Sequence, residues 1–297
     1  MSSTYEGLSP VRQLMALLLL MLGVGMIGNL IAEGLLQLNG LSLFTLADAV
    51  DINPKERLWL RIGLMINHFS MFLGAAIAFA WIFHRNTFYE YIRTNTPVSI
   101  DTIAIWGLII LSAYPLVAFL TALNISIPLP EWARTGQDNA FQLLGNILQM
   151  NGIGDLFISL ILVALLPALG EELIFRGIVQ NKLSELIANP HIAILIASLL
   201  FGLTHMQLER ILPLSFLGLL LGYSYYYSRS IIVPIILHLL NNGLQVVSLY
   251  SIGKIDQEII ENTPELPPMM VITSLLIVVG LFLLARRRQV QASEITT

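Results

Sequence analysis

Apolar stretches, each close to the length needed to cross a bilayer, dominate the sequence. A membrane-spanning helix takes about 20 mostly apolar residues, and eight segments meet or approach that length. The predicted spans are residues 12–32, 60–83, 102–123, 154–176, 191–207, 211–227, 230–250 and 268–285. Backbone groups in lipid must bond within their own segment, which favours helices. The pattern predicts an all-α fold, a polytopic membrane bundle of about eight transmembrane helices.

The shortest predicted spans lie next to each other. Only "MQLER" separates residues 191–207 from 211–227, which predicts a tight hairpin in which one helix does not cross the membrane fully. The first span is followed by no small-residue cleavage site, so we interpret it as a retained helix rather than a signal peptide.

Two longer polar connections interrupt the apolar pattern, at residues 41–59 and 124–152. The second contains Pro128, Pro130 and Gly136, which favour a loop, with one surface helix expected at residues 141–150. This connection divides the chain, and the residues before it carry no motif that indicates a function.

The composition supports a membrane protein. Of 297 residues, 56% are hydrophobic and 11% charged, with a mean hydropathy of +0.78, whereas a soluble domain has about 25% charged residues. The net charge of −4 is too small to indicate a nucleic-acid partner. The absence of cysteine excludes disulfides, thiolate metal sites and cysteine nucleophiles.

Basic residues near the span ends predict the orientation, because lysine and arginine favour the cytoplasmic side. With eight spans both termini share one side. That side collects eight basic residues: Arg12, Arg85, Arg93, Lys182, Arg229, Arg286, Arg287 and Arg288. The other side collects six: Lys55, Arg57, Arg61, Arg134, Arg210 and Lys254. We therefore expect a multi-pass protein of the cell membrane, inner or plasma, with both termini in the cytoplasm.

The segment "LGEELIFRGIV" places Glu171, Glu172 and Arg176 in strongly apolar sequence. An ionisable group at the centre of a bilayer costs from about 2.5 kcal/mol upward, so such groups are usually paired and functional. Glu172 precedes Arg176 by four residues, the order that favours an ion pair on a helix. Glu171 points about 100° away from Glu172 around the helix axis, so the two carboxylates need not share a partner.

Two later spans carry similar polar stripes. Phe201 and His205 are four residues apart, as are His238 and Asn242, so each pair lies on one helical face. A single intramembrane histidine, asparagine or glutamate–arginine pair is often only a helix–helix contact. Several such groups within 72 residues on successive spans favour a shared cavity and a function.

Together these groups suit amide hydrolysis by an activated water molecule. A glutamate beside a neutral imidazole can hold and deprotonate water, and a second imidazole with an amide can stabilise an oxyanion. An arginine one turn away keeps a desolvated carboxylate ionised. Ser159, Ser198 and Thr204 lack the spacing of a nucleophilic triad, so no covalent nucleophile is indicated.

Three short motifs resemble those of the CAAX-protease and bacteriocin-processing (CPBP, also called Abi) family of intramembrane proteases. "EELIFRG" matches the family's EExxxR motif, "FGLTH" matches FxxxH, and "HLLNN" matches HxxxN. They occur in the family's order and spacing within residues 154–250. The resemblance divides the chain into three parts. Residues 1–150 would form N-terminal helices and polar loops, and 151–250 would form the catalytic core. Residues 251–297 would form a loop, a last span and a basic tail.

The resemblance implies that Glu171 is the general base on the attacking water, assisted by His205. Family members have been described both as metalloproteases and as metal-free glutamate proteases. Zinc, if bound, would be held by Glu171, His205 and His238. The sequence has no HExxH motif, and we expect that no cofactor is required, with zinc as the alternative.

By the same resemblance, His238 and Asn242 form the oxyanion hole, since an amide is a poor zinc ligand but a good hydrogen-bond donor. Glu172 and Arg176 would orient the first glutamate and balance its charge. The implied function is an intramembrane endopeptidase acting on a membrane-associated protein or peptide in the lipid bilayer. The alternatives are a non-catalytic scaffold or bacteriocin-immunity protein of the same fold and, less favoured, a transporter with a proton relay.

The predicted depths of Glu171 and His205 do not agree. If the two spans end as the apolar pattern suggests, Glu171 lies near one membrane face and His205 near the other. Pro167 and Gly170 could break the fourth helix, or residues 181–188 could extend it before the turn. The apolar pattern leaves both possibilities open.

Overall fold

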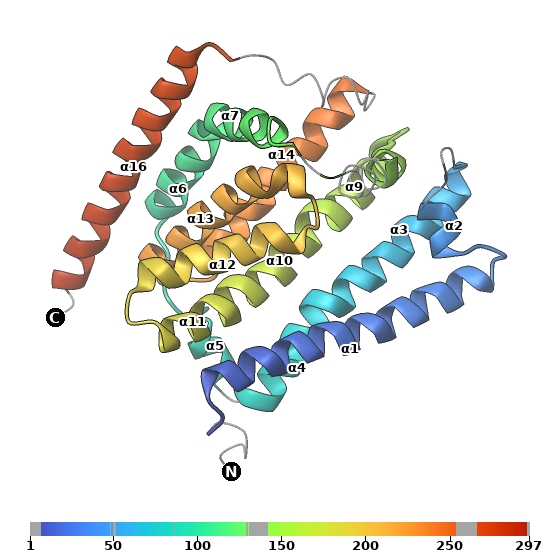
Figure 1. Ribbon diagram of the computed structural model, residues 1–297, viewed down its shortest axis with the longest axis horizontal. Coiled ribbons are helices and arrows are strands. Elements are labelled where there is room, and N and C mark those ends of the chain that lie inside the picture. Colours follow the sequence, from blue (N-terminus) through green and yellow to red (C-terminus); the bar gives the residue numbers. More distant parts are fainter. Residues whose placement is uncertain are drawn as a thin grey trace.

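A computed structural model describes residues 7–47, 49, 52–85, 87–128, 130, 142–253 and 266–295. All regular structure in these residues is helical (Figure 1), which confirms the predicted helical membrane bundle. Parts of the predicted polar loops, including residues 131–141 and 254–265, lie outside the described residues.

The N-terminal part contains two long helices and several shorter ones. Its elements are α1 (Pro10–Gln37), α2 (Leu43–Ala47), α3 (Pro54–His68), the π-helical η1 (Phe69–Gly74), α4 (Ala75–Phe83), α5 (Phe88–Tyr91), α6 (Ile100–Ser112) and α7 (Tyr114–Ile125). Residues 54–83 form one continuous helix through α3, η1 and α4. Its first turn is held by a capping box between Asn53 and Glu56.

The C-terminal part is built around another long helix. Its elements are α9 (Ile153–Ser159), η2 (Leu160–Leu165), α10 (Leu166–Glu172), η3 (Leu173–Gln180), α11 (Asn181–Leu186), α12 (Pro190–Thr204), η4 (Leu208–Arg210), α13 (Ile211–Ser228), α14 (Ile232–Ile252) and α16 (Pro268–Ile295). The first five form one helix over residues 153–186, with π-helical turns at η2 and η3.

Each of the eight predicted apolar segments coincides largely with a helix, or with the two helices α6 and α7 for 102–123, but eight full crossings are not confirmed. Within the described ranges, five helices are long and apolar enough to cross a membrane, or six if the pair α6 and α7, bent by 41°, counts as one span. α12 has 15 residues and so reaches only about 22 Å, less than the hydrocarbon thickness of about 30 Å.

The predicted hairpin is formed by α12 and α13, which pack along each other (Figure 1). Gly202 permits this close approach, since a Cβ there would lie 2.3 Å from the Ser215 hydroxyl oxygen. The short α12 agrees with the expectation that one helix of the pair does not cross fully. Small residues of this kind let transmembrane helices approach closely.

The long helix 153–186 resolves the depth mismatch between the first two motifs. Pro167 does not break it, and the chain stays helical through Leu186. Glu171 therefore lies 15 residues before the turn, and His205 lies 15 residues after the start of α12 at Pro190. At 1.5 Å per residue both are about 22 Å from the turn, so their depths match.

The segment predicted as a surface helix at 141–150 is helical over residues 142–148 but is not on the surface. Ile147 and Leu148 are buried in a hydrophobic cluster with residues of α1, α3 and α14. Two buried arginines of α3 hold it there: Arg57 donates to the carbonyl of Asn146, and Arg61 donates to that of Ile147. The surface assignment was wrong because these long-range bonds are invisible in the local pattern.

The helices fall into three groups across the molecule. In Figure 1, α1 and α3 lie at one side, α10 to α14 lie in the middle, and α16 lies at the other side against α6 and α7. The start of α1, the α11–α12 turn and the end of α16 all lie toward the same edge of the view. This arrangement places the polar motif residues at the centre of the bundle.

Candidate active site

Glu172 and Arg176 form a fully buried ion pair. The Arg176 Nη1 lies 2.7 Å from Glu172 Oε1, and the two side chains are 1% and 0% exposed. This is the pairing that their spacing predicts. The other end of the guanidinium donates to the carbonyl of Gly218 on α13 at 2.9 Å, so the arginine also joins two helices.

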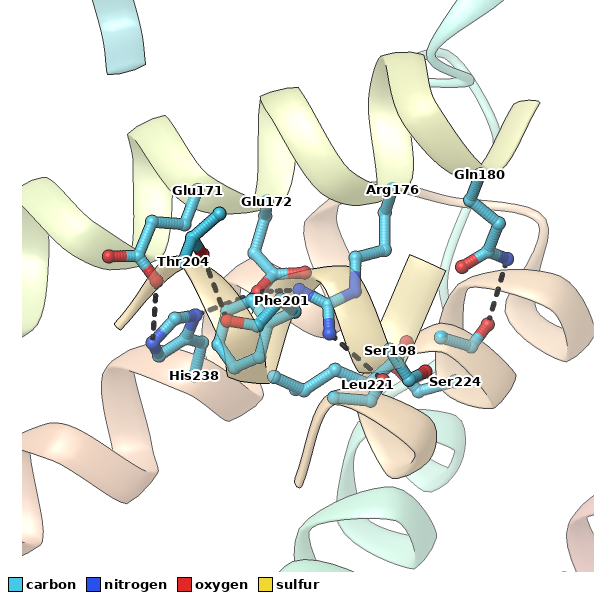
Figure 2. Close-up of polar contacts among 12 residues, drawn as sticks. Glu171, Glu172, Arg176, Gln180, Ser198, Phe201, Thr204, Leu221, Ser224 and His238 are labelled. Atoms are coloured by element: carbon cyan, nitrogen blue, oxygen red, sulfur yellow. Dashed lines mark hydrogen bonds and ion pairs between the residues drawn. The ribbon is translucent and has the colours of Figure 1, made fainter. Parts of the chain in front are cut away.

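His238 completes this buried group. Its Nδ1 lies 2.7 Å from the same Glu172 oxygen (Figure 2). A carboxylate accepts hydrogen bonds, so Nδ1 carries the proton and donates. The imidazole orientation is thereby set, and its Nε2 points toward Glu171, 4.0 Å from Oε2.

The ring of Phe201, the first residue of the FxxxH motif, lies between these groups. The Arg176 guanidinium carbon is 4.7 Å from its centroid, a cation–π contact. The rings of His205 and His238 contact it edge-on at centroid distances of 5.0 and 5.8 Å. Phe201 therefore packs the three motifs together, a role that the sequence motif alone did not indicate.

Glu171 occupies a different position, between two imidazoles that do not quite reach it. Its Oε2 is 4.0 Å from His238 Nε2, and its Oε1 is 3.9 Å from His68 Nε2. Both distances exceed hydrogen-bond length. Within the described part of the chain, Glu171 Oε2 and His68 Nε2 are buried without a hydrogen-bond partner. Polar atoms that lack a partner at this spacing can both bind one water molecule or one substrate atom placed between them.

His68 is a site residue that the sequence analysis missed, because it belongs to the N-terminal part, where no motif was found. The available signal was an imidazole inside the apolar span 60–83. Gly170 brings it close: a Cβ there would lie 2.8 Å from the Cβ of Phe72. The His68 ring stacks on Phe72 at 4.6 Å, so this helix contact also orients the imidazole.

His205 lies at the end of α12, and its Nδ1 is 2.8 Å from the carbonyl oxygen of Phe201. The carbonyl can only accept, so Nδ1 is the donor and Nε2 of the neutral ring is left unprotonated. No hydrogen bond or ion pair among the described residues joins His205 to Glu171. The two side chains instead line the same cavity.

Asn242 connects α14 to the long helix. Its Nδ2 donates to the carbonyl of Val163 at 3.0 Å, and its Oδ1 accepts from Asn241 at 2.9 Å. Pro167, four residues after Val163, has no N–H to donate to that carbonyl. Asn242 thus satisfies a group that the proline leaves open, and it has a structural role at this position.

A cavity of about 820 Å³ brings the polar groups together with apolar walls. Its polar lining includes residues from five parts of the chain: Asn67, His68, Tyr114, Glu171, His205, Gln207, Arg210, Asn242 and Gln245. Leucine, isoleucine and valine side chains supply most of the rest. Such a pocket, mostly apolar with a few convergent polar groups, is typical of a ligand-binding or active site.

The residues that the sequence offered for zinc do not form a metal site in this arrangement. In the ranges that the structure describes, no three histidine, cysteine or acidic side chains are grouped closely enough to hold a metal ion. The Nδ1 atoms of His205 and His238 are engaged by a carbonyl and by Glu172. Their Nε2 atoms remain available as donors. A zinc ion takes four ligands at about 2.0–2.3 Å, and the described residues bring no three such side chains close enough together to hold one.

Comparison with protein families identifies the class of this core. Residues 153–244 match the family model described as type II CAAX prenyl endopeptidase, Rce1-like. This segment contains all six predicted site residues and excludes His68. Residues 153–244 are therefore similar to the CAAX protease (CPBP) family, which confirms the resemblance of the three motifs.

A similar curated protein is the membrane-embedded CAAX protease MroQ of Staphylococcus aureus (strain USA300). The two are 33% identical over 96 residues, which cover 30% of this chain and 38% of MroQ. The likeness is thus confined to a minor part of either protein. No solved structure matches the chain.

Proposed function

We propose that this protein is an intramembrane endopeptidase that hydrolyses a peptide bond of a membrane-associated protein or peptide. The observation that carries the proposal is Glu171, held within 4.0 Å of two imidazoles in a cavity large enough for a peptide segment. The family match of residues 153–244 supports the same reaction class.

The proposed reaction begins with a water molecule beside Glu171. The carboxylate accepts a proton from the water, and the resulting hydroxide attacks the carbonyl carbon of the scissile bond. Glu171 then returns the proton to the leaving amine as the tetrahedral intermediate collapses. Glu171 suits this task because no hydrogen bond from the described residues reaches its carboxylate to compete for the water.

The oxyanion of the intermediate would be stabilised by His238 and Asn242. His238 already donates its Nδ1 proton to Glu172, so its Nε2 can donate only when the ring is doubly protonated. The group contains two carboxylates, both beside His238, and one guanidinium, so an imidazolium would bring its total charge to zero. Asn242 has a second amide hydrogen beyond the one given to Val163, and it lines the cavity.

We propose that the reaction needs no resident metal. The support is the spacing of the donors: among the described residues, no three histidine, cysteine or acidic side chains are grouped closely enough to hold a metal ion. Glu172 and Arg176, which bind each other and His238, would position the imidazole rather than contact the substrate.

We further propose that both termini are cytoplasmic, because the basic residues collect at the corresponding loop ends. Reporter fusions after Arg288 and near Arg93 should both give cytoplasmic signals. A fusion at Lys55 should give the opposite signal and serves as the control. A periplasmic signal at either of the first two positions would reverse the orientation without changing the reaction.

The central test compares peptide cleavage by the full chain and by Glu171→Gln in detergent, using a peptide library. The substitution keeps the size of the side chain but removes the proton acceptor. We expect turnover to fall by about 10²- to 10⁴-fold, the range for lost acid–base catalysis, with an unchanged thermal unfolding midpoint.

Glu185→Gln is the matched control, since Glu185 lies on the same long helix but pairs with Lys182 and is 40% exposed. It should cleave like the wild type. Near-normal turnover in Glu171→Gln would reject the mechanism and favour a non-catalytic scaffold of the same fold.

A further inference from the structure

His68 is the one histidine of the cavity that the three motifs do not include. It comes from the end of α3, more than 80 residues before the segment that matches the family model. It lines the cavity with Glu171, His205 and Asn242. Nothing in the proposed reaction so far uses it, although a buried, unpartnered imidazole nitrogen is costly in a membrane helix.

The two imidazoles around Glu171 approach different oxygens of its carboxylate. His238 Nε2 is nearest to Oε2, at 4.0 Å, and His68 Nε2 is nearest to Oε1, at 3.9 Å. His238 is already anchored by Glu172. The gap between His68 and Glu171 is too long for a direct hydrogen bond but is bridged by one water with two normal bonds.

The local structure holds His68 in this position. The π-helical turn η1 begins at the next residue, and its Phe72 stacks on the imidazole. π-helical turns are rare and occur frequently at functional sites. The same turn packs against Gly170, directly before Glu171, so the two side chains are placed by one contact.

We propose that His68 is a further catalytic residue, which holds the attacking water together with Glu171. The water gives one hydrogen to Glu171 Oε1 as the proton that is transferred. In the neutral tautomer of His68 that carries its proton on Nδ1, the unpartnered Nε2 accepts the second hydrogen of the water, which stays on the oxygen. A lone pair of the oxygen then faces the scissile carbonyl, and His68 gains or loses no proton in the step. This inference rests on the proposed endopeptidase function.

The test compares His68→Leu with His68→Gln by peptide cleavage in detergent. Leucine removes the acceptor nitrogen and puts an apolar side chain in its place, whereas glutamine restores an acceptor oxygen. His68→Leu should lower kcat about 10- to 150-fold, as expected for losing a hydrogen bond in a charged site, with little change in KM. His68→Gln should recover part of this loss. Both should unfold at the wild-type temperature.

His191→Leu is the matched control, because His191 is exposed at the start of α12 and contacts Tyr223 rather than the cavity. It should cleave like the wild type. The double variant His68→Leu with Glu171→Gln should be no slower than Glu171→Gln alone, since both residues act on one water.

The outcomes separate the two proposals. Wild-type kcat in His68→Leu, while Glu171→Gln is inactive, would overturn the role of His68 and leave the endopeptidase function standing. A loss in His68→Leu that follows a lower unfolding temperature, without recovery in His68→Gln, would assign the residue to packing. Retained activity in Glu171→Gln would overturn both proposals.

Discussion

The two adjacent glutamates of the first motif occupy opposite kinds of environment. Around Glu172, hydrogen bonds of 2.7 Å from Arg176 and His238 converge on one oxygen, and the side chain is fully buried. Around Glu171, the nearest imidazole nitrogens stand 3.9 and 4.0 Å away, and the side chain faces a cavity. Glu172 is anchored through Oε1 by two close hydrogen bonds, although its Oε2 has no partner among the described residues. The carboxylate of Glu171 has no close hydrogen bond and opens on the cavity.

This difference shows how one short motif serves both structure and chemistry. Consecutive residues of a helix point about 100° apart, so one glutamate faces α13 and α14 and the other faces the cavity. The anchored Oε1 of Glu172 holds His238 in its orientation. The carboxylate of Glu171 remains free to bind water and substrate. We therefore expect substitutions around Glu172 to lower stability and substitutions around Glu171 to lower turnover.

The largest stability effect is expected from Arg176→Ala. Removing one partner of a buried ion pair costs about 3–5 kcal/mol because the remaining charge is uncompensated. Chemical or thermal unfolding in detergent measures the loss. Arg288→Ala is the control, since the Arg288–Asp101 pair is exposed and such pairs contribute about 0–1 kcal/mol. Equal stability losses in the two variants would contradict the buried role of Arg176.

Asn242→Ala should lower turnover by about 10²- to 10³-fold, as the loss of one oxyanion donor does. It should also cost about 1 kcal/mol of stability, because its hydrogen bond to Val163 is lost. Steady-state cleavage and unfolding measure the two effects.

The comparison for Asn242→Ala is Asn181→Ala, which removes hydrogen bonds to Tyr225 and Gly177 away from the cavity. It should lower stability without a matching loss of kcat. If both asparagine variants keep their turnover, Asn242 acts only as a helix–helix contact.

Gly170→Ala tests the contact that joins His68 to Glu171. The added Cβ would lie 2.8 Å from Phe72, and overpacking of this kind costs about 1–3 kcal/mol. Displacement of the helix should also reduce kcat. Gly107→Ala is the control, because its Cβ would meet Leu240 at an ordinary 3.9 Å. Wild-type stability in Gly170→Ala would show that the two helices do not approach this closely.

The smallest effect is expected from metal removal. Strong chelators should leave peptide cleavage unchanged, and the purified protein should contain well under one zinc per chain. Elemental analysis and cleavage after dialysis provide the measurement. Stoichiometric zinc with chelator-sensitive activity would contradict the metal-free proposal and require Glu171, His205 and His238 to move closer together.

Much of the site follows from local sequence. The spacing of Glu172 and Arg176 predicts their ion pair, since residues four apart on a helix are neighbours whatever the surroundings. The spacing of Phe201 and His205 predicts their shared face, and the two rings are in contact. The hairpin of α12 and α13 could also be predicted, because two short apolar segments joined by a very short polar connection leave few other arrangements.

The sequence by itself thus determined a helical membrane bundle and the motif residues of its core, because helical periodicity and apolar length are local properties. Only the tertiary structure decided that the helix extends to Leu186, which gives Glu171 and His205 the same depth. It alone brought His68 to Glu171 across about 100 residues of chain and Asn242 to the carbonyl freed by Pro167. Such contacts depend on how whole helices pack, and no spacing rule along one helix contains that information.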